Sequence, residues 1–258
     1  MGCTCSSAAI DQVQELDEQL IVKASTSVEL PQPVIFALIR NGHEVIRGRL
    51  QDIKILLERG ELEMATSEWA NLRKWYHTHL LLELGTEKGA RGFLRLLDKH
   101  CDGISTKEDF FAGYESVRLS EEEVSGAFET TDMFQIKAIF YEHKDALFDL
   151  LKREDEKLMP CVEDMAERNL DLKQLMKRDV LDGVCNTFGF ESFVRYGFGT
   201  LEKHDGGMPR VRVYGYALWA VATHKQWEQW EKWIKESILD ESFEELNEVI
   251  QADKKGKR

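Results

Sequence analysis

The chain has 258 residues, enough for one large domain or two small ones, and a formal net charge of −13 at pH 7. Apolar residues make up 43% of it, so a well-formed core is expected, and long runs rich in Leu, Glu, Lys, Ala and Met favour helices. The acidic balance disfavours nucleic acid as a partner, and it disfavours electrostatic adhesion to anionic lipid.

The first seven residues, MGCTCSS, match the pattern for N-terminal acylation. Removal of the initiator methionine exposes Gly2 for myristoylation, with Ser6 at the fifth position of the mature chain. A single myristoyl chain binds a membrane only marginally, and Cys3 and Cys5 offer palmitoylation as a second signal. Residues 1–33 are therefore predicted to be a lipidated, flexible tether that holds the protein at the cytoplasmic face of a membrane.

Other general features narrow the class of protein. The sequence contains no run of 18 apolar residues, so no segment is predicted to span a bilayer. Its five cysteines have no repeated spacing, which fits neither a disulfide framework nor a CxxC zinc site and favours a reducing compartment. No nucleophile–base arrangement or phosphate-binding glycine loop points to an enzyme.

Beyond residue 33 the hydrophobic pattern predicts helices almost to the C-terminus. The predicted helical segments are residues 34–58, 62–84, 90–99, 107–114, 120–160, 162–184, 190–203 and 214–239. We expect a helical bundle over residues 34–165, a C-terminal helical extension over 166–245 and a basic tail over 246–258.

Three local signals set boundaries inside this pattern. Ser120 followed by Glu123 is a capping-box spacing, which predicts that a helix begins there. A bend is expected near Thr131, where the long segment that reaches Pro160 contains two threonines and an aspartate. The sequence HDGGMP, which starts at His204, predicts a loop.

Two histidines lie on the predicted inward faces of the first two helices. His43 belongs to a stripe of residues spaced alternately by three and four, which places it on a buried face. His79 and Glu83 lie on the corresponding stripe of the second helix, one turn apart. A short connection at Gly60 makes the two helices antiparallel neighbours. With a rise of about 1.5 Å per residue, His43 and His79 then lie at nearly the same height.

Three polar groups at one height in a core favour a metal site over a hydrogen-bonded polar layer. A buried glutamate needs a cation or another partner, and imidazole with carboxylate suits iron, manganese or zinc. A later inward stripe contains His143 and Glu154, which are eleven residues or about 16 Å apart and cannot bind one ion together; Asp155 and Glu156 are alternatives to Glu154. His100 ends a further apolar stripe and would add another nitrogen ligand if it turns inward.

With these residues in place, the sequence resembles the hemerythrin-like (HHE cation-binding) family. The resemblance rests on NGHEVIRGRL with His43, on HLLLE with His79 and Glu83, and on LKREDEKLMP with Glu154, and it covers roughly residues 34–239. It implies an all-α fold, a hemerythrin-like up-down four-helix bundle with a C-terminal helical extension. It also implies a non-haem iron pair in the core that binds dioxygen or acts as an iron or redox sensor.

The second half of the chain departs from the family pattern. The family has a histidine one turn before the carboxylate of the last helix, where this chain has Leu150. It also has a histidine that opens the third helix, where this chain offers only glutamates 121–123. Leucine cannot bind a metal, so the first half of the metal site is expected to be intact and the second half damaged. We expect one or two iron ions, with dioxygen as their ligand. The predicted metal ligands are His43, His79, Glu83, Glu154 and His100.

Two alternatives remain open. Residues 98–108 resemble an EF-hand calcium loop, in which Asp98 opens the loop, Gly103 makes the turn and Glu108 closes it, although the loop is one residue short. This would make the chain a myristoylated calcium switch. The other alternative is a metal-free helical scaffold that binds a protein partner.

Overall fold

The computed structural model describes residues 34–84, 107–130, 132–167, 189–204 and 207–256. Every regular element in these ranges is an α-helix, which confirms the predicted all-α class. The predicted acylation sites in the first five residues and the predicted calcium loop with His100 lie outside them. In the same ranges, no helix combines the length and the apolarity that a bilayer span requires.

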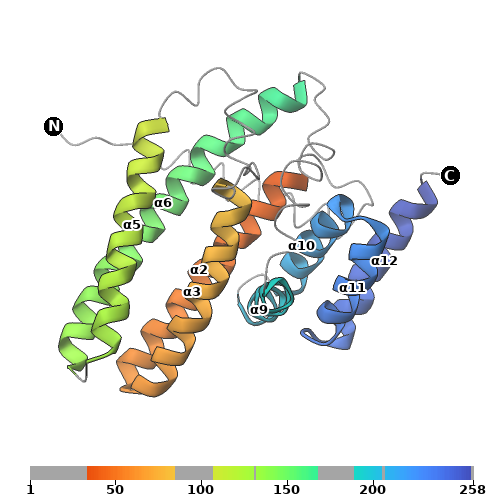
Figure 1. Cartoon of the computed structure of the whole chain (residues 1–258). Coiled ribbons are helices and arrows are strands. Elements are labelled where there is room, and N and C mark those ends of the chain that lie inside the picture. The colour runs from red at the N-terminus through yellow and green to blue at the C-terminus, as the bar shows by residue number, and fades with distance from the viewer. Residues whose placement is uncertain (1–33, 85–106, 131, 168–188, 205–206, 257–258) are drawn as a thin grey trace.

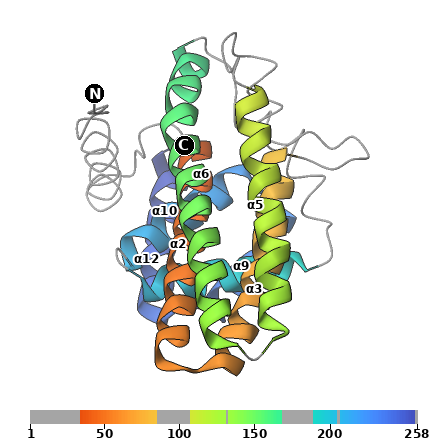
Figure 2. The same cartoon turned by 90° about the vertical axis from the view of Figure 1, so that its left-hand side faces the viewer.

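Four long helices run side by side, as two views at right angles show (Figures 1 and 2). They are α2 (Val34–Arg59), α3 (Leu62–Leu84), α5 (Lys107–Phe128) and α6 (Met133–Glu167). Gly60 joins α2 to α3 with a φ of 78°, a left-handed conformation that favours glycine. At the start of α6, the Asp132 carboxylate accepts hydrogen bonds from two backbone N–H groups, which confirms the expected bend near Thr131.

The C-terminal part packs against this group of helices (Figure 1). It contains α9 (Phe190–Lys203), α10 (Gly207–Val221), α11 (His224–Lys235) and α12 (Asp240–Gly256). Helices α9 and α10 contact α2, while α11 and α12 form an outer layer. Because α2 also contacts α3 and α6, it is covered on several sides and lies at the centre of the molecule.

The predicted helix start at Ser120 is wrong. Helix α5 continues through this position, and the Ser120 hydroxyl donates to the Val117 carbonyl oxygen within the helix. Tyr114, Val117 and Val124 are buried at helical spacing on both sides of Ser120. Packing of this apolar face therefore outweighs the local capping preference.

The prediction of one continuous helix over residues 214–239 is also wrong. The chain leaves the helix at Ala222, and Thr223 caps the next helix by accepting a hydrogen bond from the Gln226 backbone N–H. The Gln226 side chain accepts one from the Thr223 backbone N–H in return, a complete capping box. Downstream, α12 forms a regular helix as far as Gly256, across the predicted start of a basic tail at residue 246.

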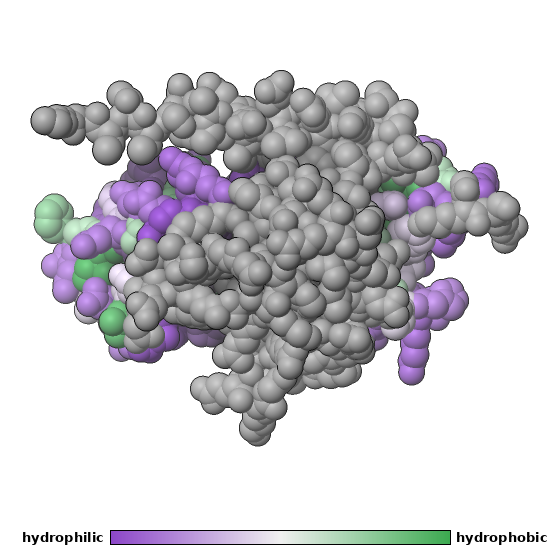
Figure 3. Space-filling view, turned by 90° about the horizontal axis from the view of Figure 1, so that it is seen from above, coloured by the Kyte–Doolittle hydropathy of each residue, from purple (hydrophilic) through white to green (hydrophobic). Residues whose placement is uncertain are grey.

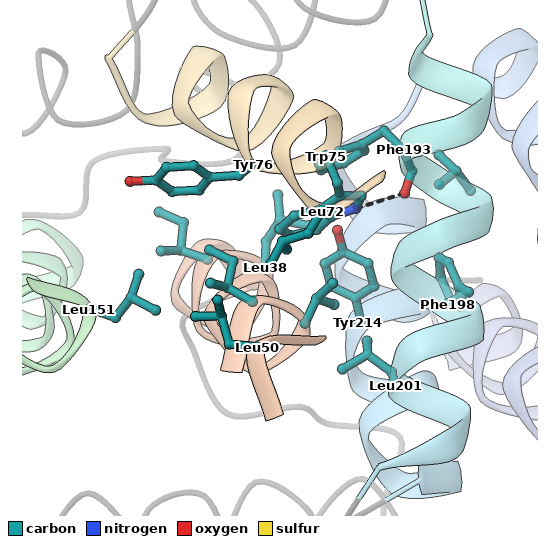
Figure 4. Packing of buried hydrophobic residues seen from close by; sticks show 14 of the residues in the cluster. Leu38, Leu50, Leu72, Trp75, Tyr76, Leu151, Phe193, Phe198, Leu201 and Tyr214 are labelled. Carbon is teal, nitrogen blue, oxygen red and sulfur yellow. Dashed lines mark hydrogen bonds between the residues drawn. The ribbon is translucent and has the colours of Figure 1, made fainter. Parts of the chain in front are cut away.

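The predicted stripe on α2 forms the middle of the core. Its residues Ile46, Leu50, Ile53 and Leu57 have no solvent exposure, and each contributes about 1.5–3 kcal/mol through burial of its side chain. Side chains from α2, α3, α6, α9 and α10 meet around it (Figure 4). From above, the described residues at the outline of the molecule are mainly hydrophilic, with a few apolar side chains between them (Figure 3).

A polar contact fixes α9 on α2. The Arg49 side chain donates through Nε to the Thr200 hydroxyl at 2.7 Å, and its guanidinium lies 4.5 Å from the centre of the Tyr196 ring. Next to it, His204 Nε2 lies 3.1 Å from a carboxylate oxygen of Asp52. The imidazole of His204 packs on Gly48, where a Cβ atom would lie only 2.7 Å from it. His204, which the sequence places in a surface loop, therefore helps to fix the C-terminal part.

His143 lies in a second buried contact, between α3, α5 and α6. Its Nδ1 is 2.8 Å from the Ser120 hydroxyl, and its ring meets Trp69 edge to face at 5.3 Å. Burial lowers the pKa of His143 to about 4, although the nearby Glu121 carboxylate acts in the opposite direction.

This histidine predicts a pH dependence of folding. The folded state keeps the His143 imidazole neutral, with a pKa of about 4 against an ordinary value of 6.5. Its contribution is thus fully present above about pH 6.5 and is lost as the pH falls towards 4, a change of about 3 kcal/mol. Urea unfolding across this range should show the loss, and His143→Gln should flatten the curve. His224→Gln, at an exposed histidine, should leave the curve unchanged.

Candidate metal centre

His43 lies between two carboxylates in the interior of the protein. Its Nδ1 is 2.7 Å from Asp155 Oδ1, and its Nε2 is 3.2 Å from Glu154 Oε2. The side chains of His43 and Glu154 have no solvent exposure, and that of Asp155 has 3%. Helix α2 supplies the imidazole and α6 supplies both carboxylates, so these contacts tie the two helices together.

Two arginines of α2 complete the surroundings of Asp155. Arg40 and Arg47 donate to Asp155 Oδ2 at 2.6 and 2.8 Å. Burial alone would raise the pKa of Asp155, but His43 and the two guanidinium groups hold it at about 2. The carboxylate is therefore ionised at neutral pH and accepts a hydrogen bond from His43 Nδ1–H. This bond fixes the orientation of the imidazole and directs Nε2 towards Glu154.

The contact between His43 Nε2 and Glu154 requires a positive charge. With the proton on Nδ1, the lone pair of Nε2 would face a carboxylate oxygen, which is unfavourable in a buried place. Either a proton or a metal cation between the two atoms removes the conflict. Two ligands at about 2.1 Å from one ion stand about 3.0 Å apart at a right angle and about 3.4 Å apart in a tetrahedron. The observed 3.2 Å fits two neighbouring ligands of one ion.

His79 brings a second imidazole to the same place. Its ring centre lies 5.4 Å from that of His43, which confirms that the two histidines are at one height. His79 also stacks with the indole of Trp75, with 5.2 Å between ring centres and 13° between planes. Its ring also lies against Gly42, where a Cβ atom would be 2.5 Å from His79 Cε1. Gly42 thus provides the space into which the imidazole fits.

Of the predicted ligands, the structure places His43 next to both Glu154 and His79. The side chain of Glu83 is not among those described, and His100 lies outside the described residues. Among the residues that the structure describes, no group of three or more His, Cys, Asp or Glu side chains is arranged to hold a metal ion. The described part therefore contains one close pair of possible ligands, His43 and Glu154, with His79 beside His43.

Leu150 and Glu121, which stand at or near the positions where the hemerythrin-like family has further histidines, make other contacts. Leu150 is buried and packs on Gly113, where a Cβ atom would be 3.0 Å from Leu150 Cδ1. Glu121 forms ion pairs with Arg73 and His77 of α3. Burial would raise the pKa of Glu121, but hydrogen bonds from these two side chains lower it below its usual value.

Sequence reasoning missed the role of the residues around His43. It treated Asp155 only as an alternative to Glu154, whereas the structure buries both and gives them different nitrogens of one imidazole. It did not consider Arg40 and Arg47 at all. Their spacing contains a signal, because residues three before and four after His43 lie on the same side of a helix.

Comparison of the chain with protein-family models, with curated proteins and with solved structures finds no match. The resemblance to the hemerythrin-like family therefore stays a prediction from the motifs.

The close approach of His79 to α2 can be tested with Gly42→Ala. The added methyl group would overlap an imidazole that also stacks with Trp75, so the free energy of unfolding should fall by about 1–3 kcal/mol in urea titration. Gly126→Ala is the matched control. Gly126 lies within helix α5, and a Cβ atom there would have no neighbour within 4 Å. This second change should raise the stability by up to about 1 kcal/mol. Equal effects of the two changes would contradict the tight contact.

Proposed function

We propose that this protein is a membrane-anchored, hemerythrin-like helical protein that binds non-haem iron in its core, for oxygen or iron sensing or storage. The observation that carries the proposal is the His43 imidazole, held by Asp155 through one nitrogen and directed at the buried Glu154 carboxylate through the other. A ligating histidine whose second nitrogen binds a carboxylate is the usual arrangement at protein metal sites.

Each side chain has a distinct role in this proposal. His43 and Glu154 are ligands of one ion, and His79 and Glu83 are further ligands from α3. Asp155 fixes the tautomer of His43, while Arg40 and Arg47 keep Asp155 ionised. Bound iron would supply dioxygen binding or one-electron redox chemistry. Leu150, where the family has a histidine, favours a single ion over a pair.

A metal-free scaffold is the competing function, and the same contact supports it. A distance of 3.2 Å between His43 Nε2 and Glu154 Oε2 also fits a charge contact between a protonated imidazole and the carboxylate. A doubly protonated imidazole would then bridge Asp155 and Glu154 without any metal. Metal content separates the two functions directly.

The first test is the metal content of the full chain, purified without a metal-affinity tag, together with its absorption spectrum in air. Iron bound in stoichiometric amount is expected, and Glu154→Gln should abolish it because the amide removes the charged ligand. Glu156→Gln is the matched control, since Glu156 is an exposed carboxylate on the same turn of α6. Wild-type protein that stays free of iron after loading would exclude the iron function and leave the scaffold.

Asp155→Asn tests the orienting role of this carboxylate. The amide cannot hold the His43 imidazole in the same way, so iron affinity should fall about 10- to 100-fold. A competition titration with a coloured chelator measures the change. An affinity equal to that of the wild type would show that the contact between Asp155 and His43 is only structural.

The proposed anchor predicts a separate result. Gly2→Ala removes the acceptor of the myristoyl group, so incorporation of an alkyne-labelled myristate in cells should cease. The protein should also move from the membrane fraction to the soluble fraction, because Cys3 and Cys5 alone lack the first membrane contact. Ser7→Ala, outside the pattern, should change neither result.

A further inference from the structure

A stack of aromatic rings leads away from the candidate metal centre. Trp75 stacks with two rings, that of His79 at 5.2 Å and 13° and that of Phe193 of α9 at 4.8 Å and 11°. Tyr196, one turn further along α9, has its ring centre 6.5 Å from that of Trp75. The indole thus connects His79 of α3 with α9 of the C-terminal part, and Figure 4 shows its hydrogen bond to Phe193.

The position of Trp75 is fixed closely. Its exposed fraction is 2%, and its Nε1–H donates to the Phe193 carbonyl oxygen at 2.9 Å. Gly197 allows α9 to approach, because a Cβ atom there would lie 3.3 Å from Trp75 Nε1. A backbone carbonyl is a weak base, so the indole has no acceptor at Nε1 that could take up its proton.

Tyr196 has different surroundings. Its hydroxyl donates to Glu68 Oε2 at 3.4 Å, and a carboxylate can accept a proton. Burial raises the pKa of the Tyr196 phenol, and the Glu68 carboxylate acts in the same direction, although Arg49 opposes them. The phenol therefore stays protonated until it is oxidised, and it then has a base within reach. Tryptophan and tyrosine are the two aromatic side chains that lose an electron most readily.

We propose that Trp75 and Tyr196 form a redox relay that carries one-electron oxidising equivalents from the core site to the surface of α9. A one-electron oxidant at the core site, such as a redox-active metal ion, takes an electron from Trp75 and leaves a tryptophan radical cation. Tyr196 then reduces Trp75 with one electron and transfers its phenolic proton to Glu68. The products are neutral Trp75, a neutral tyrosyl radical and a protonated Glu68.

The surroundings of the two rings set the direction of the relay. The Trp75 radical cation cannot lose its proton to the Phe193 carbonyl, so it remains a strong oxidant. Tyr196 becomes a neutral radical when Glu68 takes the proton. The oxidising equivalent thus comes to rest at Tyr196, which is half-buried and accessible to an external reductant. In the molecule this role presupposes the iron site proposed above, whereas the pair itself can be tested without metal.

The test is photochemical oxidation of the metal-free full chain by a ruthenium tris-bipyridine complex with persulfate as the electron acceptor. Transient absorption should show a tryptophan radical cation that decays into a tyrosyl radical, and frozen samples should show the tyrosyl radical by electron paramagnetic resonance. In Tyr196→Phe the tryptophan radical should persist and the tyrosyl signal should drop at least several-fold. In Trp75→Phe the transient absorption of the tryptophan radical that precedes the tyrosyl radical should be lost.

Matched variants control for folding and for surface oxidation. Trp69→Phe removes a buried tryptophan from the same helix, and Tyr141→Phe removes a tyrosine of α6; both should leave the transfer unchanged. Circular dichroism establishes that each variant is folded, and Trp75→Tyr, which keeps an oxidisable ring, should partly restore the transfer. The relay is overturned if no tyrosyl radical forms, or if Trp75→Phe and Tyr196→Phe behave like their controls.

A second measurement separates this relay from the iron site. The chain is loaded with ferrous iron and exposed to dioxygen, and the tyrosyl signal is measured in wild type and in Glu154→Gln. A signal that requires both Glu154 and Trp75 supports the relay and the iron site together. A photochemical signal in a protein that binds no iron leaves the relay intact and overturns the proposed function. Bound iron with no photochemical electron transfer leaves the proposed function intact and overturns the relay.

Discussion

The packing of α2 against α6 depends on neutralisation of two buried carboxylates. Glu154 and Asp155 of α6 have almost no contact with water, and α2 supplies the groups that face them, His43 with Arg40 and Arg47. Removal of one partner from a buried ion pair typically costs about 3–5 kcal/mol, because the other charge stays behind. The long apolar stripe of α2 supplies most of the buried apolar surface of this helix, but these charged groups fix how α2 and α6 are aligned.

The sequence predicted this site in part, and the limit has a physical origin. The alternating spacing placed His43 and His79 inward, and antiparallel packing placed them at one height, because both rules depend only on helix geometry. The same rules cannot tell whether Glu154 or Asp155 faces the core. Both do, since α2 presents cationic groups over a wide part of the α6 surface. That information belongs to the neighbouring helix and not to the local pattern.

The helix boundaries could likewise be predicted only in part. The predicted spans of α3 and α9 agree with the structure because strong signals, the glycines at their ends and the apolar period, coincide there. The helix start predicted at Ser120 fails because the buried residues of α5 continue on both sides of it. The C-terminal part could be predicted as helical, but its position could not. Its contacts with α2 and α3 depend on Arg49 and on the space at Gly48 and Gly197.

The central place of α2 has a consequence for how the chain reaches its native state. The contacts of α2 join residues far apart in sequence: His43 with Asp155 over 112 positions and Arg49 with Thr200 over 151. During synthesis α2 leaves the ribosome early, whereas the groups that cover it leave late. Long-range contacts of this kind slow folding. Until they form, the uncovered apolar surface of α2 promotes aggregation. Of the helices that the structure describes, α2 is made first and must wait for partners as late in the chain as α10, and chaperone binding before then would protect its exposed apolar stripe.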